Sequence, residues 1–258
     1  MLRLIDTHAH LDEIENLHTA LKDASDVGVV AIVAVGTGYD SNKRVLEISR
    51  QYKNLVYPAL GLHPWQLANM EPLEVERTLH HIEDNLGEAV AIGEVGLDYH
   101  KRVKSLASKD RQQAVLRGLM GLAKKYNMPT IIHSRYSWKD ALTVVMEAGI
   151  GRAVFHWYTG PSSVLRDIIA QGYFVSATPA TEYHAEHRRA IRETPLSNLL
   201  LETDAPVEYG RESKYTSSPK DVRRSLSAAS EIKGIEDTAL AELTTQNALR
   251  FFSMVISP

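Results

Sequence analysis

Two histidines follow the first apolar segment of the chain, with a single alanine between them, in the stretch Leu4-Ile5-Asp6-Thr7-His8-Ala9-His10. Side chains alternate between the two faces of an extended chain, so His8 and His10 point to the same side. Imidazole is the commonest metal ligand near neutral pH. Because a His-x-His pair also arises by chance, its interpretation as a metal site depends on which other residues converge on it.

Further side chains that bind metals stand at the ends of other apolar segments: Glu94, His133, His156 and Asp204. If the segments are parallel strands of one barrel, all these side chains project onto one rim. Four imidazoles and two or three carboxylates form a metal site with nitrogen and oxygen ligands, which is typical of catalytic centres. Six ligands exceed the need of one tetrahedral ion with an open position. Two divalent ions, bridged by a carboxylate and a hydroxide, fit the set better.

The elements that must position these residues alternate regularly along the chain. Short apolar runs predict strands at Leu2–Asp6, Val29–Val35, Leu55–Leu60, Ala89–Gly93, Thr130–His133, Arg152–His156, Tyr173–Ser176 and Asn198–Glu202. Amphipathic segments predict helices at Ile14–Val27, Ser41–Tyr52, Pro72–Leu86, Lys109–Tyr126, Ser137–Ala148, Pro161–Ala170, Glu182–Glu193, Pro219–Lys233 and Glu236–Phe252.

This alternation predicts an α/β fold, a (β/α)₈ TIM barrel that forms a single domain over residues 1–258. A doubly wound open sheet is the alternative. Two long connections, Glu94–Ser108 and Thr203–Ser218, follow strands and are expected on the active-site face.

The composition excludes several classes of protein. Hydrophobic residues make up 44% of the chain and the net charge is −3, so a strongly basic surface that coats long nucleic acid is not expected. The chain has no cysteine, which excludes thiolate zinc sites and iron–sulfur clusters. No segment has the length of a signal peptide core or a membrane span, and nothing indicates an obligate protein partner, so a cytoplasmic enzyme is expected. Two clusters of basic residues are interpreted equally well as a short cradle for phosphates or as solvated charge: Lys101, Arg102, Lys104, Lys109 and Arg111, and Lys214, Lys220, Arg223 and Arg224.

Six motifs along nearly the whole chain connect it to a known family. They are Ile5-Asp6-Thr7-His8-Ala9-His10-Leu11-Asp12, Gly61-Leu62-His63-Pro64, Ala91-Ile92-Gly93-Glu94-Val95-Gly96-Leu97-Asp98-Tyr99, Pro129-Thr130-Ile131-Ile132-His133-Ser134-Arg135, His156-Trp157-Tyr158-Thr159-Gly160 and Leu200-Leu201-Glu202-Thr203-Asp204-Ala205-Pro206. With them, the chain resembles the TatD-type metal-dependent deoxyribonucleases, a branch of the amidohydrolase-like barrels.

The resemblance implies a role for each candidate residue. One ion is held by His8, His10, Glu94 and Asp204, and Glu94 bridges to a second ion held by His133 and His156. His63, Arg135 and Glu202 lie on the substrate side. The expected function is hydrolysis of DNA phosphodiester bonds at strand ends by a hydroxide bridging two divalent ions, which are zinc, magnesium or manganese. Asp204, a catalytic residue together with Glu94, is the expected acceptor of the water proton.

Some features leave alternatives open. The loop Val207–Pro219 lacks the Arg-Asn-Glu-Pro stretch that the family often carries, so a small-molecule amidohydrolase, lactonase or phosphoesterase on the same metal platform remains an alternative. Trp65 and Tyr136 offer either stacking surfaces for a base or local packing, and packing is favoured. The pairs His80-His81 and His184/His187 are expected on the surface.

Overall fold

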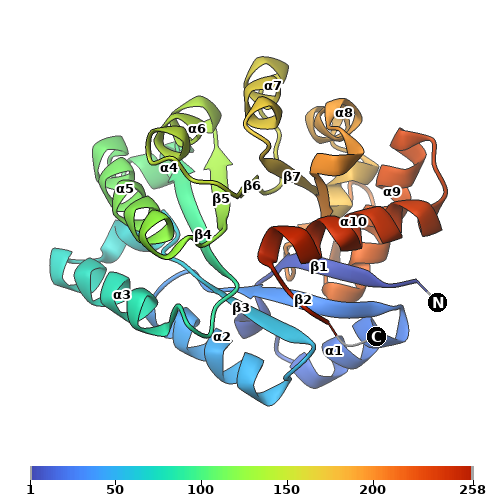
Figure 1. Ribbon diagram of the computed structural model, residues 1–258, viewed down its shortest axis with the longest axis horizontal. Coiled ribbons are helices and arrows are strands. Elements are labelled where there is room, and N and C mark those ends of the chain that lie inside the picture. Colours follow the sequence, from blue (N-terminus) through green and yellow to red (C-terminus); the bar gives the residue numbers. More distant parts are fainter. Residues whose placement is uncertain (1, 257–258) are drawn as a thin grey trace.

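The computed structural model of the protein describes residues 2–256 and places eight parallel strands in one sheet in sequence order (Figure 1). The strands are β1 (Leu4–Ala9), β2 (Val29–Val35), β3 (Val56–Leu60), β4 (Ala91–Asp98), β5 (Thr130–Arg135), β6 (Ala153–Phe155), β7 (Phe174–Ala177) and β8 (Leu199–Leu201). All eight predicted strands are present.

Helices surround the strands on the outside of this sheet (Figure 1). They are α1 (Leu17–Asp26), α2 (Tyr39–Gln51), α3 (Pro72–Asn85), α4 (Lys101–Lys104), α5 (Lys109–Tyr126), α6 (Trp138–Glu147), α7 (Ser162–Ala170), α8 (Ala185–Glu193), α9 (Val222–Lys233) and α10 (Asp237–Phe252). Capping residues mark the positions where some of these helices begin. Helix α3 begins at Pro72 with a capping box between Glu71 and Glu74, and α5 begins after Ser108, whose hydroxyl accepts from the Arg111 amide.

The sheet curls until its first and last strands meet. A bridge pairs Ala9 with Ala205, the His10 amide donates to the Ala205 carbonyl at 2.7 Å, and the Asp204 amide donates to the His8 carbonyl at 2.9 Å. The predicted TIM barrel is therefore confirmed, and the doubly wound open sheet is not formed. Strand β2 is apolar over its whole length because helices cover the outer face of the sheet and side chains fill the interior.

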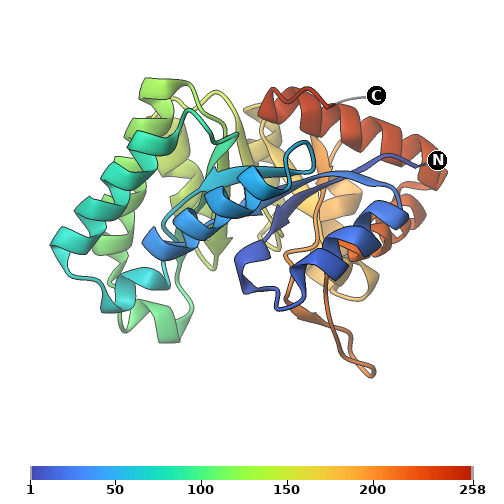
Figure 2. The same cartoon turned by 90° about the horizontal axis from the view of Figure 1, so that it is seen from below.

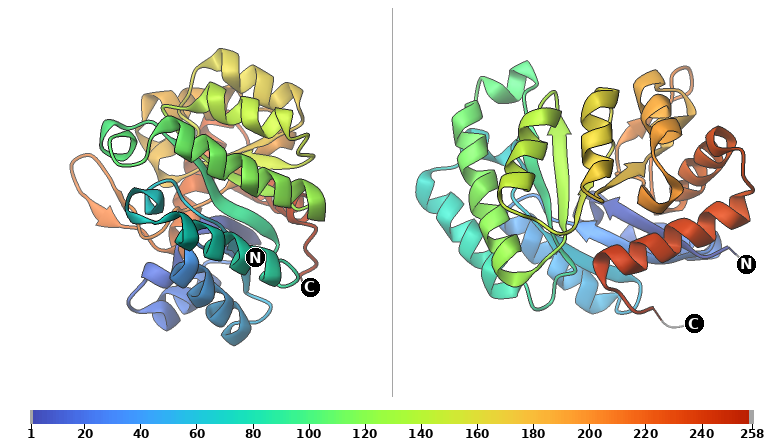
Figure 3. Two further views of the ribbon diagram at one scale, coloured as in Figure 1. Left: turned by 90° about the vertical axis from the view of Figure 1, so that its left-hand side faces the viewer. Right: turned by 45° about the horizontal axis from the view of Figure 1, so that its top comes forward.

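Both long connections contain structure that the sequence patterns do not predict. Strand β4 continues to Asp98, five residues beyond its predicted end at Gly93, and α4 follows it. The connection after β8 forms a short antiparallel hairpin of β9 (Glu208–Tyr209) and β10 (Tyr215–Thr216), which projects from the barrel in orange (Figures 2 and 3). Within the described part of the chain, no helix is both long and apolar enough to cross a membrane.

Candidate metal centre

The six predicted metal ligands come together where the strands end. His8 lies in β1 and His10 directly follows it, Glu94 lies in β4 and His133 in β5. The other two, His156 and Asp204, lie just beyond β6 and β8. The barrel thus brings together side chains that are almost 200 positions apart in the sequence, at the rim where barrel enzymes build their sites.

Glu94 stands at the centre of the cluster, and its two carboxylate oxygens face different partners. Oε2 lies 3.5 Å from Nε2 of both His8 and His10. Oε1 lies 2.8 Å from Nδ1 of His133 and 2.8 Å from Nε2 of His156. A carboxylate between two groups of donors has the arrangement required of a ligand that bridges two ions.

The distances around Asp204 fit metal ligation. Asp204 Oδ1 lies 3.3 Å from Nε2 of both His8 and His10, which is long for a charge-assisted hydrogen bond. Two ligand atoms of a tetrahedral ion, each about 2.0–2.1 Å from it, are separated by about 3.4 Å. The spacing of these donors therefore matches an ion among them.

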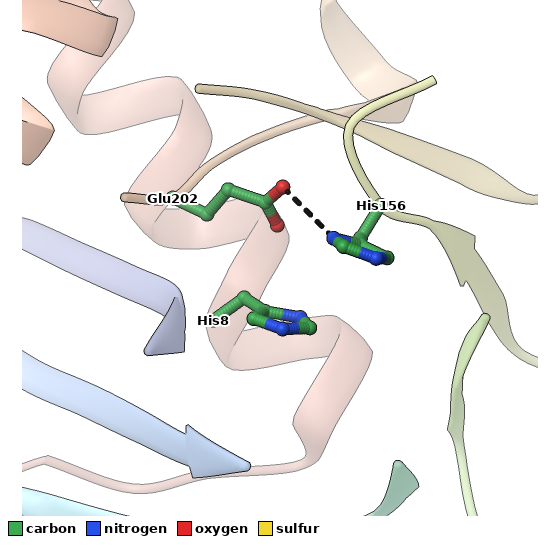
Figure 4. A group of neighbouring side chains, drawn as sticks. All are labelled: His8, His156 and Glu202. Atoms are coloured by element: carbon green, nitrogen blue, oxygen red, sulfur yellow. Dashed lines mark ion pairs between the residues drawn. The ribbon is translucent and has the colours of Figure 1, made fainter. Parts of the chain in front are cut away.

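His8 supports the same interpretation. Its ring is fully buried, and neither Nδ1 nor Nε2 has a hydrogen-bond partner. The ring stacks on His156 with centroids 4.2 Å apart, and Figure 4 shows His8 below Glu202 and His156 to the right of it. A buried polar atom without a partner is costly, and a bound ion would satisfy it.

Glu202 lies beside the outer ring nitrogen, Nδ1, of His156. Its Oε1 lies 3.4 Å from Nδ1 of His156 and accepts from the Trp157 amide at 3.0 Å (Figure 4). Glu202 is 1% exposed, so it contacts the histidine and not the solvent. A carboxylate on the outer nitrogen of a metal-binding histidine orients the ring and raises its basicity. Glu202 therefore lies beside His156, and its predicted substrate-side role stays a prediction.

A buried network positions Asp204. The Asp6 carboxylate accepts from the Thr203 amide at 2.9 Å and from the Thr203 hydroxyl at 2.5 Å. It also accepts from the His8 amide at 3.3 Å. Asp204 itself has a φ of 51°, a left-handed conformation that few residues other than glycine adopt. Asp6 thus ties the end of β8 to β1 and fixes the backbone that presents Asp204.

Asp98 joins the cluster, although the sequence motif that contains it predicts no role for it. Its carboxylate contacts His133 Nε2 at 3.2 Å, accepts from Trp65 Nε1 at 2.7 Å and pairs with Arg135 Nη2 at 2.9 Å. The signal was available, because Glu94 and Asp98 stand four positions apart and share a face of an extended strand. The early predicted end of β4 hid it.

Glycine lets two backbones approach this centre. A Cβ atom on Gly61 would lie 2.3 Å from the Glu94 carbonyl oxygen, and one on Gly96 would lie 2.0 Å from the His133 carbonyl oxygen. Gly96 also has a φ of +154°. Side chains at these positions would displace the strands that carry Glu94 and His133.

The electrostatics of the cluster favour bound cations. Burial opposes ionisation of Glu94, but the imidazoles of His63 and His156 outweigh it and hold the pKa of Glu94 well below its usual range. Burial also opposes protonation of His10, but the neighbouring carboxylates of Asp204 and Glu94 outweigh it and raise the pKa of His10 to about 9. The carboxylates that attract a proton to the imidazoles equally attract a divalent ion, and protons compete with that ion as the pH falls.

The substrate-side residues lie beside the cluster. Nε2 of His63 is 3.5 Å from Glu94 Oε1, and burial lowers the pKa of His63 to about 4, so its ring is neutral at pH 7. The Arg135 side chain is 38% exposed, so its guanidinium stays accessible while Asp98 holds it.

One histidine predicted on the surface is buried. His187 in α8 is inaccessible to solvent, and its Nε2 accepts from the Thr178 amide at 3.1 Å. Its Nδ1 lies 2.9 Å from the Tyr158 carbonyl and therefore carries the proton. The prediction was wrong for His187 because the spacing of two histidines does not show which one faces the barrel. His80 is exposed, His81 is half-buried, and the His184 side chain is 42% exposed.

Buried, neutral His187 makes stability depend on pH. Burial lowers the pKa of His187 from 6.5 to about 4, so between these values the unfolded chain binds more protons than the folded one. Stability from this group is therefore present above pH 6.5 and is lost as the pH falls, by about 2 kcal/mol between pH 7 and 5. Chemical denaturation of the wild type and of His187→Gln at both pH values should show a smaller loss in the variant. His80→Gln, on the exposed face of α3, serves as the control and should keep the wild-type loss. An equal loss in His187→Gln would contradict the assignment.

Comparisons with known proteins follow the same motifs. A family model described as "TatD related DNase" matches residues 5–253. The chain is 32% identical over 261 residues to "Deoxyribonuclease TATDN3" of Homo sapiens, covering 96% of this chain and 94% of that protein. It is also 32% identical over 259 residues to YabD of Bacillus subtilis (strain 168), an uncharacterized metal-dependent hydrolase, covering 96% and 98%.

A solved structure agrees with these matches. The crystal structure of YJJV, a TatD homolog from Escherichia coli K12, superposes with a TM-score of 0.88 at 28% identity, covering 98% of this chain and 99% of that one. The names of the relatives confirm the predicted class of enzyme, a metal-dependent hydrolase. The chain therefore belongs to the family of TatD-related DNases.

Proposed function

We propose that this protein hydrolyses phosphodiester bonds of DNA at strand ends, with two divalent ions as cofactors. The observation that carries the proposal is the position of Glu94, whose two oxygens face two separate groups of donors. The names of the family model and of the human relative support DNA as the substrate. Residues 1–258 make up the hydrolase domain in this proposal.

The ligands divide between the two sides of Glu94. His8, His10 and Asp204 would hold one ion with Glu94 Oε2, since their donor atoms lie within 4.8 Å of one another. His133 and His156 would hold the other with Glu94 Oε1. When bound, zinc, magnesium or manganese ions lower the pKa of a water molecule and neutralise charge on phosphate oxygens.

The remaining residues bind the substrate and move the proton. Asp204 accepts the proton of the attacking water, because its carboxylate lies in the cluster and faces His8 and His10 through Oδ1, which leaves Oδ2 for the water. Arg135 binds a phosphate oxygen through its planar guanidinium, which Asp98 aims at the site. His63, neutral at pH 7, adds a hydrogen bond to the same phosphate. Glu202 orients His156, as its contact with the outer nitrogen indicates.

Chelation followed by stepwise restoration of metal tests the proposal. End-labelled single-stranded and duplex DNA should be degraded by the protein as isolated, spared after treatment with a chelator, and degraded again when manganese, magnesium or zinc returns. The ladder of labelled products also gives the direction of cleavage. Turnover of lactones or cyclic amides by the restored protein, with both DNA substrates intact, would contradict it and favour the small-molecule hydrolase.

A further inference from the structure

Two exposed aromatic side chains border the metal centre. Within residues 2–256, the large aromatic side chains that are exposed are Trp65 at 53%, Tyr126 at 43% and Tyr136 at 60%. Trp65 follows the motif that carries His63, and Tyr136 follows Arg135. Local packing, the role predicted for Trp65 and Tyr136, does not account for side chains that remain more than half exposed.

Trp65 is held by a hydrogen bond at its indole nitrogen, and more than half of the side chain is exposed to solvent. Its indole nitrogen donates to Asp98 Oδ2 at 2.7 Å, and the Arg135 guanidinium carbon lies 5.2 Å from the ring centroid. Asp98 also contacts His133 at 3.2 Å, so a single side chain separates Trp65 from a proposed metal ligand. The exposed ring therefore has a set orientation beside the cluster and loses little freedom when a ligand covers it.

Tyr136 is held outward by its backbone. Its φ of 58° is left-handed, a conformation that is uncommon for a bulky residue and that persists only where the surroundings impose it. The ring stacks near His100, with centroids 6.1 Å apart and planes 26° apart. It meets Trp138 edge-on at 5.8 Å. Two neighbours support the ring, and most of its surface still faces solvent.

Positive charge lies beside these rings. Arg135 directly precedes Tyr136 in the chain, and His100, the neighbour of Tyr136, directly precedes α4. Lys101, Arg102 and Lys104 of α4 are all exposed. Aromatic surfaces alternating with cations are typical of sites that bind single strands, where bases stack on the rings and phosphates meet the cations.

We propose that Trp65 and Tyr136 form a stacking platform for unpaired nucleobases next to the phosphodiester that is cleaved. In this arrangement Arg135, which lies 5.2 Å from the Trp65 ring and directly precedes Tyr136, contacts the phosphate while a neighbouring base covers an aromatic ring. The inference rests on the proposed function and adds to it the residues that distinguish a base-bearing strand from a bare sugar–phosphate chain.

The test compares two substrates that differ by one base. The metal-loaded enzyme is given a thymidine hexamer and the same hexamer with a stable abasic residue at the end that is cleaved, and kcat and KM are measured for both. The wild type should prefer the thymidine end by about tenfold or more in kcat/KM, because stacking of one base contributes this much. Trp65→Ala and Tyr136→Ala should each move the ratio toward one, mainly through KM.

Matched variants separate stacking from other effects. Tyr136→Phe and Trp65→Phe keep an aromatic ring and should retain most of the preference, and Trp65→Phe removes the hydrogen bond to Asp98 as well. Tyr126→Ala, at the exposed end of α5, should keep the full wild-type ratio. Thermal unfolding of each variant shows that it is folded.

The outcomes distinguish this proposal from the proposed function. A wild-type ratio near one, or a tenfold ratio that both alanine variants retain, would overturn the platform while DNA hydrolysis stands. A ratio lost equally in Trp65→Phe would overturn stacking on that ring. If the metal-loaded wild type cleaves neither hexamer, the proposed function fails and the platform fails with it.

Discussion

Glu94→Gln should lower the rate of DNA hydrolysis by about 10³-fold or more while the barrel remains folded. Glutamine has nearly the same size, but its amide nitrogen cannot bind an ion and would direct N–H groups at one side of the cluster. The carboxylate is 3% exposed and stands between the two groups of imidazoles, so the substitution removes the one group shared by both proposed ions. Initial rates on end-labelled DNA and the metal content per chain measure the effect.

The control for this variant is Glu88→Gln. Glu88 is an exposed residue shortly before β4. Its ion-pair partner is Arg50, at 2.6 Å, and not an imidazole of the cluster. Its replacement should leave the rate within about twofold, since exposed ion pairs contribute little. Wild-type activity in folded Glu94→Gln protein would refute the assignment of Glu94 as the shared ligand.

Asp204→Asn should lower kcat by about 10²–10⁴-fold, which is the range that general acid–base catalysis contributes. Asparagine keeps the shape of the side chain but loses both the negative charge next to His8 and His10 and the ability to take a proton from water. Measurement of kcat against pH, at metal concentrations that saturate the variant, isolates the proton-accepting role.

Asp23→Asn provides the matched control, because Asp23 is a surface aspartate paired with Lys220 at 2.8 Å. It should behave as the wild type. If Asp204→Asn, loaded with metal, keeps wild-type kcat over the whole pH range, the proton goes to another group and the proposed role of Asp204 is wrong.

The sequence predicts the barrel well because its signal is strong. Strand β2 is a continuous apolar run, and glycines and prolines mark the intervening helices, so the alternation is visible without a structure. Strand β4 was predicted too short because beyond Gly93 it carries Glu94, Gly96 and Asp98, which interrupt the apolar pattern. Those inward-facing residues belong to the site, and a local departure from the expected pattern is typical of functional positions.

The parts of the site that the sequence does not predict depend on contacts between distant segments. In the sequence, Asp98 is one more acidic residue in a charged segment. Its contacts with Trp65 and Arg135 form only in the folded protein. Exposure of Trp65 and Tyr136 is equally invisible in the sequence, because the same residue types fill cores and line binding surfaces. His187 shows the converse, a polar residue whose partners from two other segments make its burial favourable.

The most direct test of the account is anomalous diffraction from crystals of the wild-type protein soaked in manganese. We expect two anomalous peaks on opposite sides of Glu94, one among His8, His10 and Asp204 and the other beside His133 and His156. A single peak that does not involve Glu94, or none in a crystal that takes up manganese elsewhere, would contradict it.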